Sequence, residues 1–153
     1  MYTSKILARA SLACLIIMGF ILGTVYCASA QQRMAVSADV ANIRVGPGSD
    51  HEKLWQMEKN TPIMVQDSEG DWYRFEDFEG DRGFIHKDLV EDFETVITKK
   101  GLINIREDPG TDHEVAFQAE KGVPFRVLEK EGDWIHIKHA DGEEGWIYKG
   151  LVW

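Results

Sequence analysis

Hydrophobic and polar positions alternate over short stretches of this chain, and glycine, proline, aspartate or asparagine separates one stretch from the next. Side chains of a β-strand point to opposite faces in turn, so this pattern predicts short strands, and no window keeps a helical period over three turns. The expected strands lie at residues 40–44, 54–57, 62–66, 72–75 and 83–86, and again at 103–106, 116–118, 124–128, 134–138 and 145–148. A β-branched stretch at 95–98 predicts a further strand that opens the second set.

The two sets of strands form a tandem repeat with a constant offset of 62 residues. Residues 42–91 align without a gap on residues 104–153, and 23 of the 50 pairs are identical. Self-similarity at a fixed period indicates repeated structural units. After a leader at 1–30, we therefore expect one domain at residues 31–94 and a second at residues 95–153.

Each repeat contains a predicted β-hairpin that opens with Gly-Asp-Trp and reverses at a second glycine. Alternation assigns the apolar pair of its first strand to the core: Tyr73 and Phe75, or Ile135 and Ile137. The opposite face then carries a tryptophan beside a basic residue: Trp72 and Arg74, or Trp134 and His136. A tryptophan on the polar face of both hairpins is the first indication of a binding surface.

Residues 1–30 have the pattern of a secretory signal peptide. They contain two basic residues, no acidic residue, an apolar run over about residues 12–25 and small residues at the end. The pattern predicts cleavage after Ala30 and export to the periplasm or cell envelope. Two alternatives stay open: an uncleaved anchor, although the run is shorter than the roughly 20 residues of a spanning helix, and a lipoprotein signal through Cys27, although Tyr26 precedes it.

The charge of the chain narrows the class of partner. Removal of Lys5 and Arg9 with the leader changes the formal charge from −9 to −11, of which the first repeat carries −8 and the second −3. No basic patch is present that could neutralise phosphates. Neither nucleic acid nor, beyond the signal peptide, a membrane surface is expected as a partner.

The chain shows no catalytic motif and no set of metal ligands. Both cysteines lie in the leader, and no Cys-His pair or Gly-x-Ser-x-Gly motif occurs. His51 and His113 each lie in an Asp-His-Glu run, which we interpret as loop packing because no neighbouring strand supplies a matching ligand. The acidic residues at 76–81 are interpreted as a solvated hairpin tip, since the Asp-x-Asp-x-Asp-Gly calcium loop is absent. We expect no enzyme activity, metal or cofactor.

The ordered motifs of both repeats resemble the bacterial Src-homology-3 (SH3b) domain. The resemblance covers nearly all of residues 31–153 and rests on these motifs: Asn-Ile-Arg at 42–44 and 104–106, Pro-Gly at 47–48 and 109–110, Gly-Asp-Trp at 70–72 and 132–134, and a closing Leu-Val at 89–90 and 151–152. It implies an all-β fold of two tandem, small, strongly bent antiparallel β-barrels. It also implies an accessory module of an exported protein, for which peptidoglycan peptides are frequent targets.

The resemblance also suggests where a ligand binds. Trp72 and Trp134 match the tryptophan that forms one wall of the polyproline groove in eukaryotic relatives. The other aromatic positions of that groove match poorly, so polyproline specificity is not expected. The candidate ligand-binding residues are Trp72, Arg74, Trp134, His136 and Tyr148.

The sequence therefore predicts an exported, non-catalytic tandem binding module. Its expected ligand is a cell-wall peptide or a segment of an envelope protein, held on the tryptophan-bearing faces. The alternative is a structural or assembly protein whose two barrels pack on a partner subunit.

Overall fold

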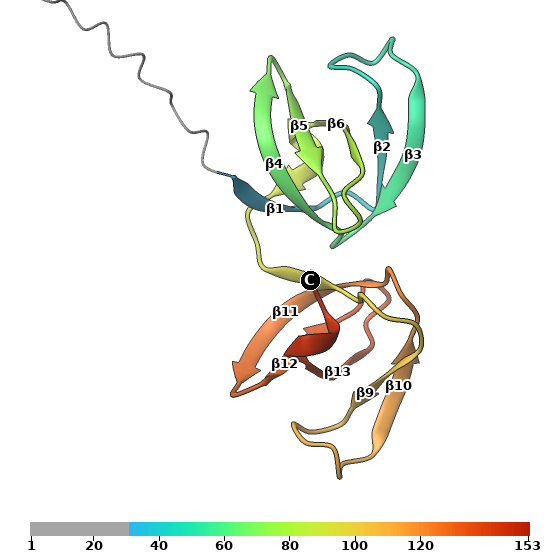
Figure 1. Ribbon diagram of the computed structural model, residues 1–153, viewed down its shortest axis with the longest axis vertical. Coiled ribbons are helices and arrows are strands. Elements are labelled where there is room, and N and C mark those ends of the chain that lie inside the picture. Colours follow the sequence, from blue (N-terminus) through green and yellow to red (C-terminus); the bar gives the residue numbers. More distant parts are fainter. Residues whose placement is uncertain (1–30) are drawn as a thin grey trace, which may run out of the picture.

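The computed structural model describes residues 31–153, so the predicted signal peptide lies outside the described residues (Figure 1). The described chain consists of β-strands and two short 3-10 helices. The first repeat contains β1 (Gln32–Val36), β2 (Val40–Arg44), β3 (Lys53–Glu58), β4 (Pro62–Glu69), β5 (Trp72–Glu76), β6 (Arg82–His86), η1 (Lys87–Leu89) and β7 (Val90–Glu91). The second contains β8 (Thr95–Ile97), β9 (Ile103–Arg106), β10 (Val115–Ala119), β11 (Pro124–Glu131), β12 (Trp134–Lys138), β13 (Glu144–Tyr148) and η2 (Lys149–Leu151).

The strands form two bent antiparallel sheets, one in each repeat (Figure 1). The order is β3-β2-β6-β5-β4-β1-β7 in the first sheet and β10-β9-β13-β12-β11-β8 in the second. A bulge in each long strand, between Val65 and Asp67 and between Val127 and Glu129, bends it where it pairs with the next strand. The fold is thus all-β and repeated, as the sequence predicts.

Each sheet curves around its own hydrophobic core. Phe75, Ile43 and Ile85 are fully buried in the first core, and their counterparts Ile137, Ile105 and Ile147 are fully buried in the second. Ile135 is also buried, whereas Tyr73 is half-buried and packs against the edge of the first core. The predicted inward faces of both hairpins are therefore confirmed.

The predicted strands are present, and the structure extends several of them. Strands β4 and β11 continue beyond the predicted ranges 62–66 and 124–128. Their second halves are polar, so hydrophobic and polar positions no longer alternate there and the pattern does not indicate a strand. It also misses β1 and the two-residue β7, which pair with each other. None of the described residues forms a helix long and apolar enough to cross a membrane.

Equivalent parts of the two repeats meet at their junction. Lys121, in the turn after β10, forms an ion pair with Glu79 at the tip of the β5–β6 hairpin. In the corresponding contact, Lys59 in the turn after β3 lines a cavity of about 150 Å³ together with His139 and Ala140 at the tip of the β12–β13 hairpin. In Figure 1, β3 and β10 both end at this junction. In both contacts, the turn after the third strand of one repeat (β3) or its counterpart (β10) packs against the hairpin tip of the other repeat, so the two repeats are related by approximate two-fold symmetry.

Arg33 adds a contact that has no counterpart in the repeat. Its guanidinium lies 4.0 Å from the centre of the Trp153 ring and donates hydrogen bonds to the carbonyl oxygens of Trp153 (2.8 Å) and Thr95 (3.3 Å). Burial lowers the pKa of Arg33, while the carboxylate of Glu94 opposes that shift. Strand β1 is thereby attached to the last residue of the second repeat.

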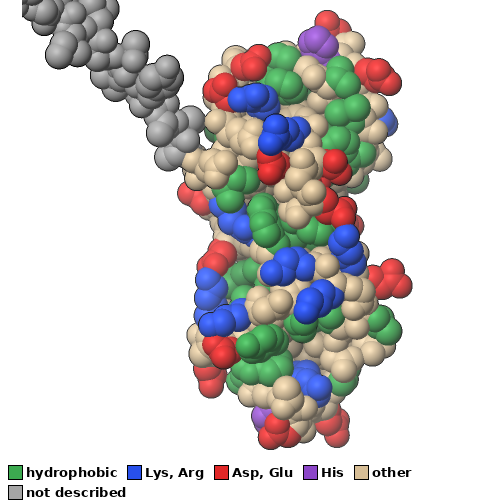
Figure 2. Space-filling view, in the orientation of Figure 1, with side chains coloured by type: hydrophobic (Ala, Val, Ile, Leu, Met, Phe, Trp, Pro, Cys, Tyr) green, Lys and Arg blue, Asp and Glu red, His purple; other side chains and the backbone are tan. Residues whose placement is uncertain are grey.

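The surface charge is unevenly distributed between the repeats. Residues 31–94 carry a formal charge of −8 and residues 95–153 one of −3. On the face in Figure 2, acidic side chains predominate over the first repeat, and Lys and Arg gather over the second repeat beside the junction. An anionic ligand is therefore less strongly repelled by the second repeat.

Candidate ligand-binding groove

The outer face of the second hairpin presents two aromatic rings side by side. Trp134 on β12 lies directly opposite Tyr148 on β13, so both side chains leave the sheet on the same face. Their ring centres are 5.9 Å apart at an interplanar angle of 69°, an edge-to-face contact. Tyr148 is 41% exposed and Trp134 is half-buried. The pair therefore offers an aromatic wall to solvent.

A groove of about 290 Å³ runs along this wall. Its lining contains Trp134, Tyr148, Ile103, Arg106, Thr111 and Leu151. Besides the hairpin, strand β9, the loop between β9 and β10, and η2 contribute lining residues. The surface is mainly apolar, with the guanidinium of Arg106, the hydroxyls of Thr111 and Tyr148 and the amide of Asn104 as its polar groups, as expected of a site that orients a small peptide.

The turn after β13 determines the orientation of the tyrosine ring. A side-chain carbon at Gly150 would lie 2.8 Å from Cε1 of Tyr148, so only glycine allows the ring to pack over this turn. Lys149 fixes the turn to the hairpin, because its Nζ lies 2.7 Å from Asp133 and its amide donates to the Asp133 carbonyl. The hydrogen bond to Asp133 raises the pKa of Lys149.

Arg106 is the cationic group of the groove. One of its terminal nitrogens donates to the carbonyl oxygen of His113 at 2.6 Å, which ties the β9–β10 loop to the sheet. A guanidinium has five N–H donors, so others remain for a ligand. A carboxylate is the natural partner, because its two oxygens match the planar fork of arginine.

The equivalent surface of the first repeat has different chemistry. Trp72 lies opposite His86 at a ring distance of 5.2 Å, and Arg44 donates to the His51 carbonyl at 2.6 Å. At the positions of Ile103 and Tyr148, this repeat has Ala41 and His86. It therefore offers a smaller, more polar surface beside its tryptophan.

Two of the predicted site residues, Arg74 and His136, do not line this groove. The ring of His136 stacks on Trp146 at 4.9 Å and does not line the groove. The guanidinium of Arg74 lies 3.7 Å from Asp67. The groove instead uses four residues that the hairpin pattern does not indicate: Ile103, Arg106, Thr111 and Leu151. Arg106 and Leu151 belong to the Asn-Ile-Arg and Leu-Val motifs, on which the family resemblance rests.

Comparison with known proteins identifies the family. The model of the bacterial SH3 domain matches twice, at residues 37–92 and at residues 99–153. The chain belongs to the bacterial SH3 domain family. Together the two matches cover most of the described residues, and each contains all strands of its sheet except the first, β1 or β8.

Individual relatives are longer proteins. A putative N-acetylmuramoyl-L-alanine amidase of Bacillus subtilis is 32% identical over 50 residues, which is 33% of this chain and 10% of the relative. A solved NlpC/P60 family protein of Bacillus cereus matches 80% of this chain and 56% of its own at 12% identity, with a TM-score of 0.40. NlpC2 of Trichomonas vaginalis matches 80% of this chain and 48% of its own, also at 12% identity, with a TM-score of 0.37. The chain spans a tenth of the amidase and about half of the solved proteins.

The histidines of the long loop in each SH3 domain pack against loop glycines. A side-chain carbon at Gly46 would lie 2.8 Å from the ring of His51, and one at Gly110 would lie 2.8 Å from the ring of His113. The imidazoles therefore fill the space that these glycines leave open. This contact supports the interpretation of both histidines as loop-packing residues.

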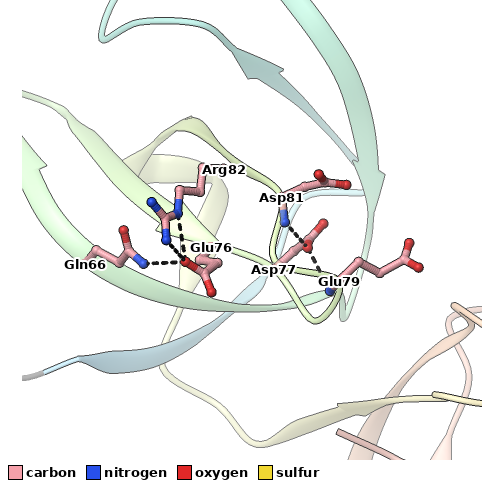
Figure 3. Close-up of polar contacts among 6 residues, drawn as sticks. All are labelled: Gln66, Glu76, Asp77, Glu79, Asp81 and Arg82. Atoms are coloured by element: carbon pink, nitrogen blue, oxygen red, sulfur yellow. Dashed lines mark hydrogen bonds and ion pairs between the residues drawn. The ribbon is translucent and has the colours of Figure 1, made fainter.

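In the acidic hairpin of the first SH3 domain, the carboxylates of Asp77 and Glu76 accept hydrogen bonds from the same repeat (Figure 3). Oδ1 of Asp77 accepts the backbone amides of Glu79 (2.9 Å) and Asp81 (3.0 Å). Glu76 accepts from Arg82 and Gln66, both at 2.8 Å, and these hydrogen bonds lower its pKa. Such bonds are typical of a tight turn, as expected for a solvated tip.

The corresponding tip of the second SH3 domain brings one histidine near two carboxylates. Ligand atoms of His139, Asp141 and Glu143 lie within 4.8 Å of one another. Asp141 accepts the Glu143 amide at 3.1 Å and lies 2.8 Å from Nδ1 of His139, and these bonds lower the pKa of Asp141. The three groups are thus explained by a turn of the same kind as in the first domain.

Proposed function

We propose that this protein is an exported binding module of the cell envelope, and that the groove beside Trp134 and Tyr148 binds a peptide carboxylate. The observation that carries the proposal is the convergence of this aromatic wall with Arg106 in one open groove. Trp, Tyr and Arg are the residues that most often anchor a protein interface. The lower negative charge of the second repeat favours an anionic ligand there.

Peptidoglycan supplies the proposed class of ligand. The B. subtilis relative is named a putative N-acetylmuramoyl-L-alanine amidase, after the bond that joins glycan and stem peptide in peptidoglycan. A stem peptide has a backbone that can lie along the aromatic wall and a terminal carboxylate that Arg106 can bind. In this proposal the module binds without catalysis and holds this material for a partner or for further domains.

The test is sedimentation of residues 31–153 with purified peptidoglycan. We expect Trp134→Ala to weaken retention by roughly 30-fold, equivalent to about 2 kcal/mol, because the groove loses one wall. The matched control is Trp72→Ala, which removes the equivalent indole from the surface that has His86 in place of tyrosine. Retention of that variant on peptidoglycan should fall by less than about threefold.

Thermal unfolding of each variant separates binding from stability. If the indole only shields the core, Trp134→Ala lowers the melting temperature and retention falls only in step with it. A folded Trp134→Ala variant with undiminished retention contradicts the proposal. Retention of an envelope protein but not of peptidoglycan would favour the alternative, an assembly protein that packs on a partner subunit.

A further inference from the structure

The cavity at the junction of the two repeats is lined mainly by cationic side chains. It measures about 150 Å³, and its lining comes from both repeats: Lys59, Asn60, Arg126, Lys138, His139 and Ala140. None of these lining residues is acidic, although residues 31–153 carry a formal charge of −11. The four basic side chains come from distant parts of the sequence, so the fold assembles a basic cluster that no run of residues indicates.

Two of these cations lie directly opposite each other on neighbouring strands. Arg126 on β11 is the register partner of Lys138 on β12, so both side chains leave the sheet on the same face. Like charges in such a pair destabilise a sheet. The equivalent pair of the first repeat is Met64 with Glu76, which has no such repulsion. A bound anion would relieve the repulsion in the second repeat.

Carboxylates outside the cavity compensate this positive charge only in part. Lys59 pairs with Asp39 at 3.1 Å, and Lys138 pairs with Glu144 at 2.7 Å. Both pairs are exposed and therefore weak, and an ammonium group has three donors, so each lysine retains donors for a ligand. Arg126 has no ion-pair partner among residues 31–153.

Asn60 adds a buried polar group without a partner. It is only 6% exposed and lines the cavity, yet none of the side-chain hydrogen bonds within residues 31–153 uses its side-chain amide. Its backbone amide donates to the Val36 carbonyl oxygen at 2.9 Å, which fixes the residue in the turn after β3. Because an unpaired buried donor is costly, a ligand oxygen that accepts from this side chain is stabilising.

The space in the cavity results from one residue exchange between the hairpin tips. In the first repeat, the ring of Phe78 lies 5.9 Å from Nζ of Lys121, and its Cζ atom would lie 3.9 Å from a side-chain carbon at Gly122. That ring fills the space between turn and tip. The residue at the equivalent position of the second repeat is Ala140, whose small side chain leaves the space open.

Contacts with neighbouring side chains hold the walls of the cavity in place. The ring of His139 lies 5.5 Å from that of Phe125, and its Nδ1 lies 2.8 Å from Asp141. The guanidinium of Arg126 lies 4.9 Å from the centre of the Phe93 ring. A guanidinium over an aromatic ring keeps N–H donors at its edge, so Arg126 can still bind an anion.

We propose that this cavity binds the phosphate dianion of a small soluble molecule. Donors reach it from the turn after β3, from β11 and from β12, which suits the several oxygens of a tetrahedral anion better than the two of a planar carboxylate. The net negative charge of the protein repels an extended anionic surface such as a membrane. Since both repeats supply donors, a bound phosphate also strengthens their junction.

The test is a titration of residues 31–153 with sodium phosphate at about pH 8, where phosphate is a dianion, followed by amide chemical shifts at constant ionic strength. We expect saturable shifts centred on residues 59–60, 126 and 138–140, and at least about tenfold weaker binding of acetate. Arg126→Met introduces the residue of the first repeat and should weaken phosphate binding about tenfold. Ala140→Phe should fill the cavity and weaken binding at least as much.

The matched control is a pair of lysine variants. Lys59→Gln removes a cation of the cavity and should weaken phosphate binding about fivefold, whereas Lys121→Gln removes the equivalent lysine of the other turn-to-tip contact and should change it less than about twofold. Equal weakening by the two variants would show only general attraction to cations and would overturn the proposal. The amide spectrum of each variant shows whether it is folded, and a folded Ala140→Phe variant with undiminished binding would also overturn it.

Sedimentation with phosphatidylglycerol vesicles distinguishes the source of the phosphate. We expect residues 31–153 to remain in solution. Sedimentation that is lost in Arg126→Met would assign the site to a lipid headgroup and would overturn the proposal of a soluble ligand. Peptidoglycan retention through Trp134 is measured separately, so either site can fail alone.

Discussion

At the scale of single residues, the outer faces of the two hairpins differ in the residue that lies beside the tryptophan. Both repeats keep a half-buried tryptophan on the outer face of the hairpin, but Tyr148 lies beside it in the second and His86 in the first. Alternation along a strand places Trp72 and Trp134 on that face, and the structure agrees. The same rule cannot identify Arg106 or Leu151, because they reach the groove from other elements.

The inward positions of the hairpins carry a direct stability prediction. Phe75 and Ile137 are fully buried, so truncation to alanine leaves a cavity in a small core. We expect Phe75→Ala and Ile137→Ala each to lower the free energy of unfolding by about 2–5 kcal/mol. Chemical denaturation measures the loss, and a value below about 1 kcal/mol would mean that these side chains do not form the core.

At the scale of the elements, glycines permit the close approach of β6 to β2 and of β13 to β9. A side-chain carbon at Gly83 would lie 2.4 Å from Cγ2 of Ile43, and one at Gly145 would lie 2.7 Å from Cγ2 of Ile105. The sequence marks both positions as identical in the repeats, but the reason is visible only in the sheet. Short strands such as β7 escape prediction because two residues show no periodicity.

Gly145→Ala tests this packing. The added methyl group would also lie 2.9 Å from the Arg106 carbonyl oxygen, a backbone atom that cannot move aside. We expect a loss of about 1–3 kcal/mol in unfolding free energy, the usual cost of overpacking. Gly101→Ala is the matched control, because nothing lies within 4 Å of its added carbon and it should change stability little. Equal stability of the two variants would refute the close approach.

At the scale of the whole molecule, two repeats with separate cores share a junction. The sequence predicts the repeat, its all-β fold and the division near residue 94. It does not predict the two-fold packing of turns against tips, since contacts such as Lys121 to Glu79 join parts that share no local pattern. For the same reason, the sequence does not indicate a groove of about 410 Å³ beside β10, whose lining includes Glu58 of the other repeat.

Separate cores predict that the fragment 95–153 folds without the first repeat. Its nine-residue buried cluster lies entirely within that range, so the fragment retains its core. It should give dispersed amide signals of the strand type, with lower stability than in the whole chain because Arg33 no longer contacts Trp153. A fragment that remains disordered until the first repeat is added would indicate one intertwined unit.

Amide shift mapping with a soluble stem peptide tests whether the second repeat binds a peptide carboxylate between its aromatic pair and Arg106. We expect shifts in residues 31–153 to centre on Trp134, Tyr148 and Leu151. The same peptide with an amidated terminus should bind at least about tenfold more weakly, because Arg106 loses its charged partner. Equal binding of the acid and the amide, or shifts that avoid this groove, would contradict it.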